Sequence, residues 1–302
     1  MDRLGAMQTF VRVAEAGSFS AAARLLEVGQ PAVSKTVAQL EAALGARLVV
    51  RSTRQIALTE DGRRYLELAR AALEAADAAD ASVGGRSADP RGLVRLATSV
   101  AFARLHIVPR LGRLFERHPG ITMELVLSDG FVDLVEAGVD VALRIGVLKE
   151  AGLVARRVGL AHRIVVAHPG YFARRGRPQR PQDLAAHDCV VYTQLATGNL
   201  WEFEGPEGAV SVPVSGRLRV STADAMREAV LEGLGVGVTP TWMWRDEVAE
   251  GRLERVLAAY EPTARPVMAV FPERRLVSPK VRAVVDFVAE EFRRDAALSP
   301  SS

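Results

Sequence analysis

A small group of polar side chains near the start of one predicted helix could contact nucleic acid. The stretch from Ser18 to Gly45 reads as two helices, because Gly29 predicts a break and Pro31 suits the first position of a helix. The free face at the start of the second helix carries Gln30, Pro31, Ala32, Ser34 and Lys35. Short polar side chains with one cation could bind base edges in a major groove. A helical hairpin with a merely solvated face would have the same spacing, so both interpretations stay open.

One apolar stripe would hold this second helix in place. Val33, Val37, Leu40 and Leu44 recur at helical spacing and form a core face. Gly45 is expected to end the helix. In front of it, we expect Ser20 to cap a short helix over 21–26.

Two further helices are predicted around this pair. The earlier one has an apolar stripe and ends at Gly17; the stripe consists of Leu4, Met7, Phe10, Val11 and Ala14. The later one is capped by Thr59 and runs to about Ala81. It repeats Leu66, Ala69, Leu73 and Ala76 with the 3-4-3 spacing of a short heptad seam. This seam favours a dimerising linker helix, with packing against the protein's own second domain as the alternative.

A predicted hairpin between these helices carries two arginines at its tip. The runs 47–50 and 55–58 are β-prone, and Arg51, Ser52, Thr53 and Arg54 lie between them. Such a tip suits the phosphate backbone of a duplex, although a solvated turn would look similar. Its position directly after the helical pair favours a wing that contacts phosphate.

The order of these features resembles the N-terminus of LysR-type transcriptional regulators. The phrases PAVSKTVAQLEAALG and LVVRSTRQIALTEDG carry the likeness, which runs from about Arg3 to Asp80. The resemblance implies that the helix with Pro31 enters the major groove and that the wing lies on the backbone. Gly29 and Val49 depart from the family pattern, which usually has Ser or Thr at the first position and Phe at the second.

A seam between two chains would duplicate the groove-reading helix. We therefore expect a dimer on an inverted repeat in double-stranded DNA. The family further implies a tetramer, and RNA polymerase is a candidate partner.

Composition bounds the remaining possibilities. A chain of 302 residues suggests two or three domains, and 49% hydrophobic with 25% charged residues is typical of globular proteins. The net charge of +3 fits nucleic-acid binding, and residues 1–59 hold seven Lys or Arg against four acids. Cys189 is the only cysteine, which excludes an intrachain disulfide and favours a reducing compartment and a buried, inert thiol. No signal pattern or long apolar run appears, so we expect a cytoplasmic protein without a membrane partner.

Motifs for catalysis or metal binding are missing from the sequence. The five histidines lack metal-ligand spacing, and no GxSxG elbow or phosphate loop is present. The glycines of 233–237 lack the third position of a dinucleotide loop. We therefore expect no catalytic residue, metal or cofactor. A transporter's solute-binding protein and an α/β enzyme with a DNA-binding appendage remain the alternatives to a regulator.

From Leu93 onward, short apolar runs alternate with helical patterns, which predicts an α/β fold with right-handed crossovers. A Gly- and Pro-containing stretch at 83–91 precedes it as a hinge. Expected strands are 93–97, 121–127, 141–145, 164–167, 189–192, 201–203, 210–214, 218–220, 236–239 and 266–271. Expected helices are 101–118, 131–138, 223–232 and 279–292, and the tail from 295 to 302 is expected to fray.

This half also resembles the effector-binding domain of the LysR family, which is similar to periplasmic binding proteins. The likeness rests on the phrases at 118–119, 140–146, 233–237 and 278–282. It implies a winged helix-turn-helix at 1–59, a linker helix at 60–82 and an effector-binding domain at 92–302. Two α/β subdomains would surround a cleft, the first from 92–160 with 266–302 and the second from 161–265.

A ligand seat is expected where a strand gives way to a helix. Thr98, Ser99 and Val100 lie at such a junction, where free amides and hydroxyls suit a carboxylate or phosphate. Thr222 precedes another helix and could face the first site across the cleft, while Thr193 and Arg144 are weaker candidates. Ordinary helix capping is the alternative for both junctions. On the binding interpretation, the effector is a small anion, most simply a carboxylate.

Overall fold

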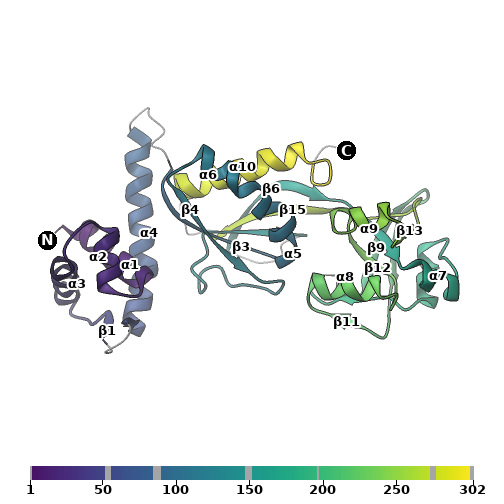
Figure 1. The fold of residues 1–302 in the computed structure, drawn as a ribbon, viewed down its shortest axis with the longest axis horizontal. Helices are drawn as coiled ribbons and strands as arrows, with labels where there is room; N and C mark the ends of the chain where they lie inside the picture. Colours follow the sequence, from purple (N-terminus) through teal and green to yellow (C-terminus); the bar gives the residue numbers. More distant parts are fainter. Residues whose placement is uncertain are drawn as a thin grey trace. The chain divides into compact units, whose positions relative to one another are not determined.

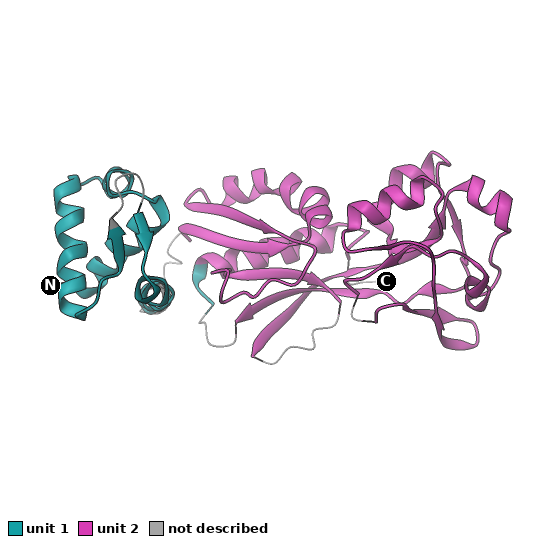
Figure 2. Ribbon diagram, turned by 90° about the horizontal axis from the view of Figure 1, so that it is seen from below, with its two compact units in different colours: residues 1–88, 274–279 teal, residues 89–273, 280–302 magenta. Residues whose placement is uncertain are grey.

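A computed structural model describes residues 2–51, 56–83, 90–146, 152–195, 197–272 and 277–299. The chain forms two compact units, residues 1–88 with 274–279 and residues 89–273 with 280–302 (Figure 2). The break between the units falls in the stretch expected to be a hinge. Within the described ranges, no helix has both the length and the apolar character needed to span a bilayer.

The first unit is a small helical domain with one hairpin (Figure 1). Its elements are α1 (Arg3–Ala16), α2 (Phe19–Leu25), α3 (Gln30–Leu44), β1 (Val49–Arg51), β2 (Ile56–Leu58) and α4 (Glu60–Val83). The predicted stripe of α3 is confirmed, because Val33, Val37 and Leu40 are buried in one core with Phe10. Gly45 ends α3 at φ 67°, a left-handed conformation that glycine adopts without strain.

Some details of this unit differ from the sequence prediction. Helix α2 begins earlier than expected, and its cap is Ser18 rather than Ser20, since the Ser18 Oγ accepts a hydrogen bond from the Ala21 amide at 3.0 Å. In α1 the buried face includes Ala6 and Val13, while Leu4 is exposed. This broader face follows from the position of α1, which packs against α2, α3 and α4 together.

Helix α4 is anchored to the first unit by its N-terminal half. The Thr59 hydroxyl caps it as predicted, accepting from the Gly62 amide at 2.8 Å. The Tyr65 ring meets Phe10 edge-on with 5.6 Å between centroids, and Arg70 pairs with Glu15 at 3.1 Å. Ala69, a member of the predicted seam, is 0% exposed. The first part of the seam therefore packs inside its own domain.

The second unit contains a five-stranded sheet with the order β4-β3-β5-β15-β6. Its strands are β3 (Gly92–Thr98), β4 (Ile121–Leu127), β5 (Val141–Ile145), β6 (Leu153–Ala161) and β15 (Arg265–Pro272). Strand β3 runs parallel to β4 and β5, whereas β15 is antiparallel to β5 and β6. Helices α6 (Leu111–Arg117) and α10 (Pro279–Arg294) lie on the same side of this sheet (Figure 1). We call this part subdomain I.

Shorter sheets form the rest of the second unit, which we call subdomain II. Strands β7 (Arg163–Ala167), β12 (Gly237–Pro240) and β13 (Glu254–Val256) form one sheet, β9 (Leu200–Gly205), β10 (Gly208–Pro213) and β14 (Glu261–Pro262) another, and β8 (Val191–Tyr192) pairs with β11 (Arg219–Val220). Helices α7 (Pro169–Arg175), α8 (Ala223–Leu231) and α9 (Arg245–Ala249) accompany them. Two short crossings join the subdomains, one from β6 to β7 and one from β14 to β15.

Several expected elements of this unit are different in the structure. The helix predicted over 101–118 is broken into α5 (Val100–Phe102), a π-helical turn (Ala103–Ile107), a 3₁₀ turn (Val108–Arg110) and α6. Pro109 lacks the amide hydrogen that a continuous helix needs there. The stretch 131–138 contains turns instead of a helix, because the Asp133 carboxylate accepts from the nearby amides of Val135 and Glu136.

The C-terminal segment also departs from expectation. Helix α10 buries Val281, Val284, Val285 and Val288, as its spacing predicts. The following residues do not fray, since Leu298 is fully buried and its carbonyl accepts from the Leu160 amide at 2.9 Å. Strands β6, β13 and β14 and helices α7 and α9 have no counterpart among the predicted elements.

Candidate functional site

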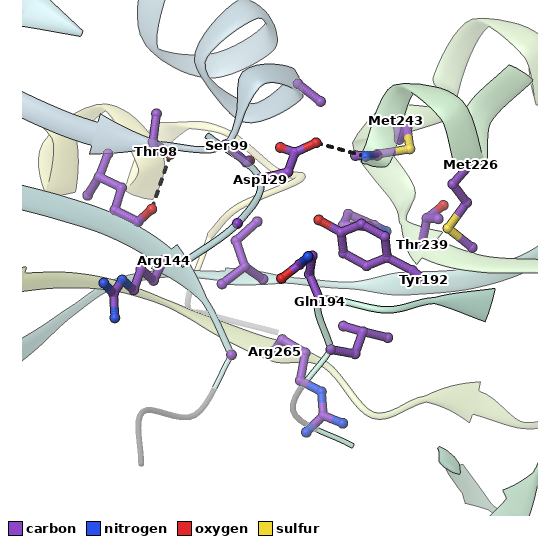
Figure 3. A pocket seen from close by; sticks show the side chains of 18 of the residues that line it. Thr98, Ser99, Asp129, Arg144, Tyr192, Gln194, Met226, Thr239, Met243 and Arg265 are labelled. Atoms are coloured by element: carbon purple, nitrogen blue, oxygen red, sulfur yellow. Dashed lines mark hydrogen bonds between the residues drawn. The ribbon is translucent and has the colours of Figure 1, made fainter. Parts of the chain in front are cut away.

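The second unit contains a cavity of about 520 Å³ between the two subdomains (Figure 3). Subdomain I lines it with residues from the carboxyl ends of three neighbouring strands, among them Ser99 after β3, Asp129 after β4 and Gly146 after β5. Subdomain II supplies Tyr192 at the end of β8, Gln194 just after it, Met226 from α8 and Thr239 from β12. Strand ends of this kind are where open α/β sheets bind ligands.

Of the six residues that the sequence predicted to bind the effector, three line the cavity and three do not. Thr98, Ser99 and Arg144 line the cavity. Val100, Thr193 and Thr222 are not among the lining residues. The Thr222 hydroxyl caps α8 by accepting from the Ala225 amide at 3.3 Å, and the Thr193 hydroxyl donates to the Val220 carbonyl at 3.1 Å. The capping interpretation therefore describes Thr222.

Two of the nominated residues that do line the cavity are engaged by the protein itself. The buried Thr98 hydroxyl donates to the Leu143 carbonyl at 3.1 Å. The Arg144 guanidinium donates to the Val132 carbonyl at 2.9 Å, and its Cζ lies 4.2 Å from the centre of the Phe131 ring. In Figure 3 this guanidinium lies on the opposite side of the pocket from Tyr192. Arg144 thus stabilises the wall of the cavity through its contacts with Val132 and Phe131.

Asp129 lies in the place where the sequence led us to expect a bound anion. One carboxylate oxygen accepts from the Val100 amide at 3.1 Å, at the start of α5. The other accepts from the Ala223 amide at 2.9 Å, at the start of α8 (Figure 3). Helix-start amides favour a negative charge, and here a carboxylate of the same chain supplies it. Asp129 was not predicted as a site residue, although its position two residues after the predicted strand 121–127 was an available signal.

Tyr192 is a second polar group that the sequence analysis missed. Its hydroxyl is directed towards the side of the pocket where Asp129 lies (Figure 3). Burial raises the pKa of the Tyr192 phenol, and the negative charge of Asp129 raises it further. The phenol is therefore neutral near pH 7 and can both donate and accept a hydrogen bond.

Three charged residues lie along the cavity where the chain crosses between the subdomains. Arg163 begins β7, Arg265 begins β15, and Glu202 belongs to β9. Arg265 pairs with Glu202 at 2.6 Å. Arg163 is only 6% exposed, and its side chain makes no hydrogen bond or ion pair with any residue in the described part of the chain. Burial and then the charge of Arg265 lower the pKa of Arg163 to about 10, so it stays protonated near pH 7.

The first unit presents the residues expected to contact DNA. Gln30, Pro31, Ala32 and Lys35 are exposed at the start of α3, and Ser34 is partly exposed. Pro31 is the second residue of the helix rather than the first, and Gly29 precedes the helix without a side chain to cap it. Arg51 ends β1, while Ser52, Thr53 and Arg54 lie outside the described residues.

Cys189 lies in the core of subdomain II. It is buried beside Leu184 and Val236, as predicted, and burial raises the pKa of its thiol to about 12. A thiol that stays protonated is a poor nucleophile. The described ranges contain no group of three or more His, Cys, Asp or Glu that could hold a metal ion.

Comparison with known proteins gave matches along almost the whole chain. Residues 4–63 match the model for "Bacterial regulatory helix-turn-helix protein, lysR family", and residues 87–293 match "LysR substrate binding domain". The HTH-type transcriptional regulator CrgA of Neisseria meningitidis (serogroup C, strain 8013) is 34% identical over 95% of this chain and 96% of its own length. The HTH-type transcriptional activator AaeR of Escherichia coli K12 is 32% identical over 97% of this chain and 94% of its own.

Solved structures agree with these sequence matches. The structure of CrgA from Neisseria meningitidis aligns with a TM-score of 0.59 and 33% identity, covering 95% of this chain and 98% of that one. The full-length Vibrio cholerae virulence activator AphB aligns with a TM-score of 0.57 and 25% identity, with the same coverage.

Proposed function

This chain belongs to the LysR family of bacterial transcriptional regulators, and we propose that a small organic anion in the cavity between the subdomains controls its binding to an inverted-repeat operator. The family assignment makes it a DNA-binding regulator with an effector-binding domain, and not an enzyme. We assign the winged helix-turn-helix to 1–59, the linker helix to 60–82 and the effector-binding domain to 92–302.

The face of α3 supports the proposed mode of DNA binding. The apolar stripe of α3 is buried in the domain core, so the opposite face at its start is free to enter a groove. Gln30, Pro31, Ala32 and Ser34 would contact base edges, and Lys35 would contact a base or a phosphate. The wing residues Arg51 to Arg54 would lie on the phosphate backbone.

Helix α4 supports a dimer that uses only part of the predicted seam. Because Leu66 and Ala69 pack within their own domain, we assign the contact between two chains to the part of α4 beyond them, which includes the partly exposed Leu73 and Ala76. Two such dimers would form a tetramer, with RNA polymerase as a further partner. We propose a cytoplasmic location, which a DNA target supports.

The cavity is the single observation that carries the effector proposal. Its volume of about 520 Å³ suits a small molecule, and its wall combines apolar side chains such as Phe131 and Met226 with a few polar groups. Both subdomains line it, so a bound molecule would favour one arrangement of the two. Through paired chains, that preference would change the spacing of the two recognition helices.

A bulky residue at the cavity wall tests this proposal. We expect Ser99→Trp to abolish thermal stabilisation by any metabolite acid that stabilises the wild type, while operator binding measured by fluorescence anisotropy persists without effector. Ser211→Trp, on the exposed face of β10 and outside the cavity, is the matched control. An acid that stabilised the Ser99→Trp protein as strongly as the wild type would place the effector elsewhere.

A further inference from the structure

We infer that the negative group of the effector binds the Arg163 guanidinium, and that the effector is a monocarboxylate with an apolar body. This inference rests on the proposed function, because it assumes that the effector occupies the cavity. It places the anion at the crossing between the subdomains and not at the helix starts, where Thr98, Ser99 and Thr222 led the sequence analysis to expect it.

The anion site predicted at the starts of α5 and α8 is already occupied by a carboxylate of the protein itself. Asp129 accepts from the amides of both Val100 and Ala223, at 3.1 Å and 2.9 Å. A carboxylate of the effector at the same place could not accept hydrogen bonds from these amides, because they already donate to Asp129. The negative charge of Asp129 would also repel it. An anionic effector therefore needs a cation elsewhere on the cavity wall.

Arg163 provides that cation. It lines the cavity, it is only 6% exposed, and within the described residues its side chain has neither a hydrogen bond nor an ion pair. A buried charge is costly unless it is paired and hydrogen-bonded. Arg144, the arginine that the sequence predicted as a weaker effector-binding candidate, is instead engaged with Val132 and Phe131.

The charges around Arg163 favour a single negative charge on the ligand. Arg265 and Glu202 form an ion pair at 2.6 Å and so neutralise each other. The cluster of these two residues with Arg163 carries a net charge of +1, which a monoanion balances. A guanidinium also presents two parallel N–H donors, which match the two oxygens of a carboxylate.

The rest of the cavity wall indicates the remainder of the ligand. Phe131, Met226, Trp242 and Met243 line it with apolar and polarisable surface. Methionine side chains adapt to apolar groups of different shape. Asp129 disfavours a second carboxylate on the ligand. A monocarboxylate with an aliphatic or aromatic body meets both requirements.

Calorimetric titration of the full-length protein with matched acids and amides tests the inference. The probes are phenylacetate and hexanoate, each compared with its neutral primary amide. We expect the carboxylates to bind the wild type more tightly than the amides. Arg163→Gln should weaken carboxylate binding about 10- to 100-fold, the usual value of hydrogen bonds to a charged group, and should leave amide binding unchanged. Arg163→Lys keeps the positive charge but loses the two parallel N–H donors of the guanidinium. Its affinity for the carboxylates should therefore lie between those of the wild type and Arg163→Gln.

The controls separate this inference from the proposed function. Arg219→Gln changes an exposed arginine outside the cavity and should leave every affinity unchanged. Carboxylates that bind Arg163→Gln as tightly as wild type, but fail to bind Ser99→Trp, would overturn the Arg163 assignment and leave the effector in the cavity. Carboxylate binding that persists in Ser99→Trp would instead contradict the proposal that the effector binds in the cavity. Amides that bind the wild type as well as the acids, or a wild type that binds neither acid, would also overturn the inference. If Arg163→Gln does not fold, Arg163→Lys and the acid-amide comparison on the wild type decide.

Discussion

The Asp129 carboxylate accepts a hydrogen bond from the Ala223 amide at 2.9 Å, although the two residues belong to different subdomains. Its second oxygen accepts from the Val100 amide within subdomain I. One side chain therefore connects the starts of α5 and α8 across the cavity. Hydrogen bonds to a charged acceptor are stronger than neutral ones, so opening the cleft at this point requires breaking a favourable contact.

Replacing Asp129 by Asn should weaken this connection and change ligand binding. Asparagine keeps the shape but has one acceptor oxygen and no charge, so we expect the free energy of unfolding to fall by about 1–2 kcal/mol. Loss of the negative charge should also tighten phenylacetate binding. Urea unfolding and calorimetric titration measure the two effects. Asp133→Asn is the control, because Asp133 accepts from two amides inside one turn of subdomain I. Equal probe affinity in wild type and Asp129→Asn would show that the Asp129 charge does not act on the ligand.

The wing and the recognition helix should respond differently to mutation. Arg54→Ala should remove the phosphate contact that we propose for the wing, so binding to all duplexes should weaken alike and the salt slope should fall by about 1. Ser34→Ala or Pro31→Ala should instead change which operator bases are preferred, since we propose that both residues contact base edges. Fluorescence anisotropy with operator and scrambled duplexes at several salt concentrations distinguishes the two. An unchanged salt slope for Arg54→Ala would exclude its phosphate contact.

His106 should make the second unit less stable in weak acid. It is only 5% exposed among the rings of Phe102, Trp242 and Phe292, and burial followed by the charge of Arg110 lowers its pKa from 6.5 to about 4. The unfolded chain therefore takes up this proton near pH 6.5, and the folded chain only near pH 4. As the pH falls from 6.5 to 4, the free energy of unfolding should therefore decrease by up to about 3 kcal/mol because of His106.

The variant His106→Leu isolates this contribution. Urea unfolding at pH values from 7.5 to 4.5 should show a smaller loss of stability for the variant than for the wild type, because leucine does not titrate. The Asp295 carboxylate lies 3.6 Å from the His106 ring, too far for a hydrogen bond, and so offsets the effect of burial only in part. Parallel stability curves for the two proteins would contradict the assignment.

Gly62 should resist substitution even though it lies in a helix. A Cβ at this position would collide with the carbonyl oxygen of Leu48, which is part of the backbone and cannot move aside freely. We expect Gly62→Ala to destabilise the first unit by about 1–3 kcal/mol, despite the better helix propensity of alanine. Gly112 in α6 has open space around it, so Gly112→Ala should stabilise the second unit by up to about 1 kcal/mol. Calorimetric melting of both variants checks the opposite signs.

The sequence by itself determined the elements whose signals lie within a few residues of each other. The stripe of Val33, Val37 and Leu40, the end of α3 at Gly45 and the Thr59 cap all follow from local spacing and local hydrogen bonds. The same holds for the apolar face of α10. Together with two recognisable phrases, these signals were enough to indicate the family. Local spacing was less informative for α5 and for residues 131–138, where Pro109 and Asp133 favour turns over a regular helix.

Only the tertiary structure decided which polar groups face the cavity and which are already paired. The amides at the starts of α5 and α8 look available in the sequence, but Asp129 reaches them from 29 and 94 residues away. Arg163 looks like an ordinary strand residue in the sequence. Among the described residues its side chain has no hydrogen bond or ion pair, while the nearby Glu202 pairs with Arg265, from which it is 63 residues distant in the chain. Burial and pairing are properties of groups brought together by folding, so no local pattern could assign the anion to Arg163 rather than to the helix starts.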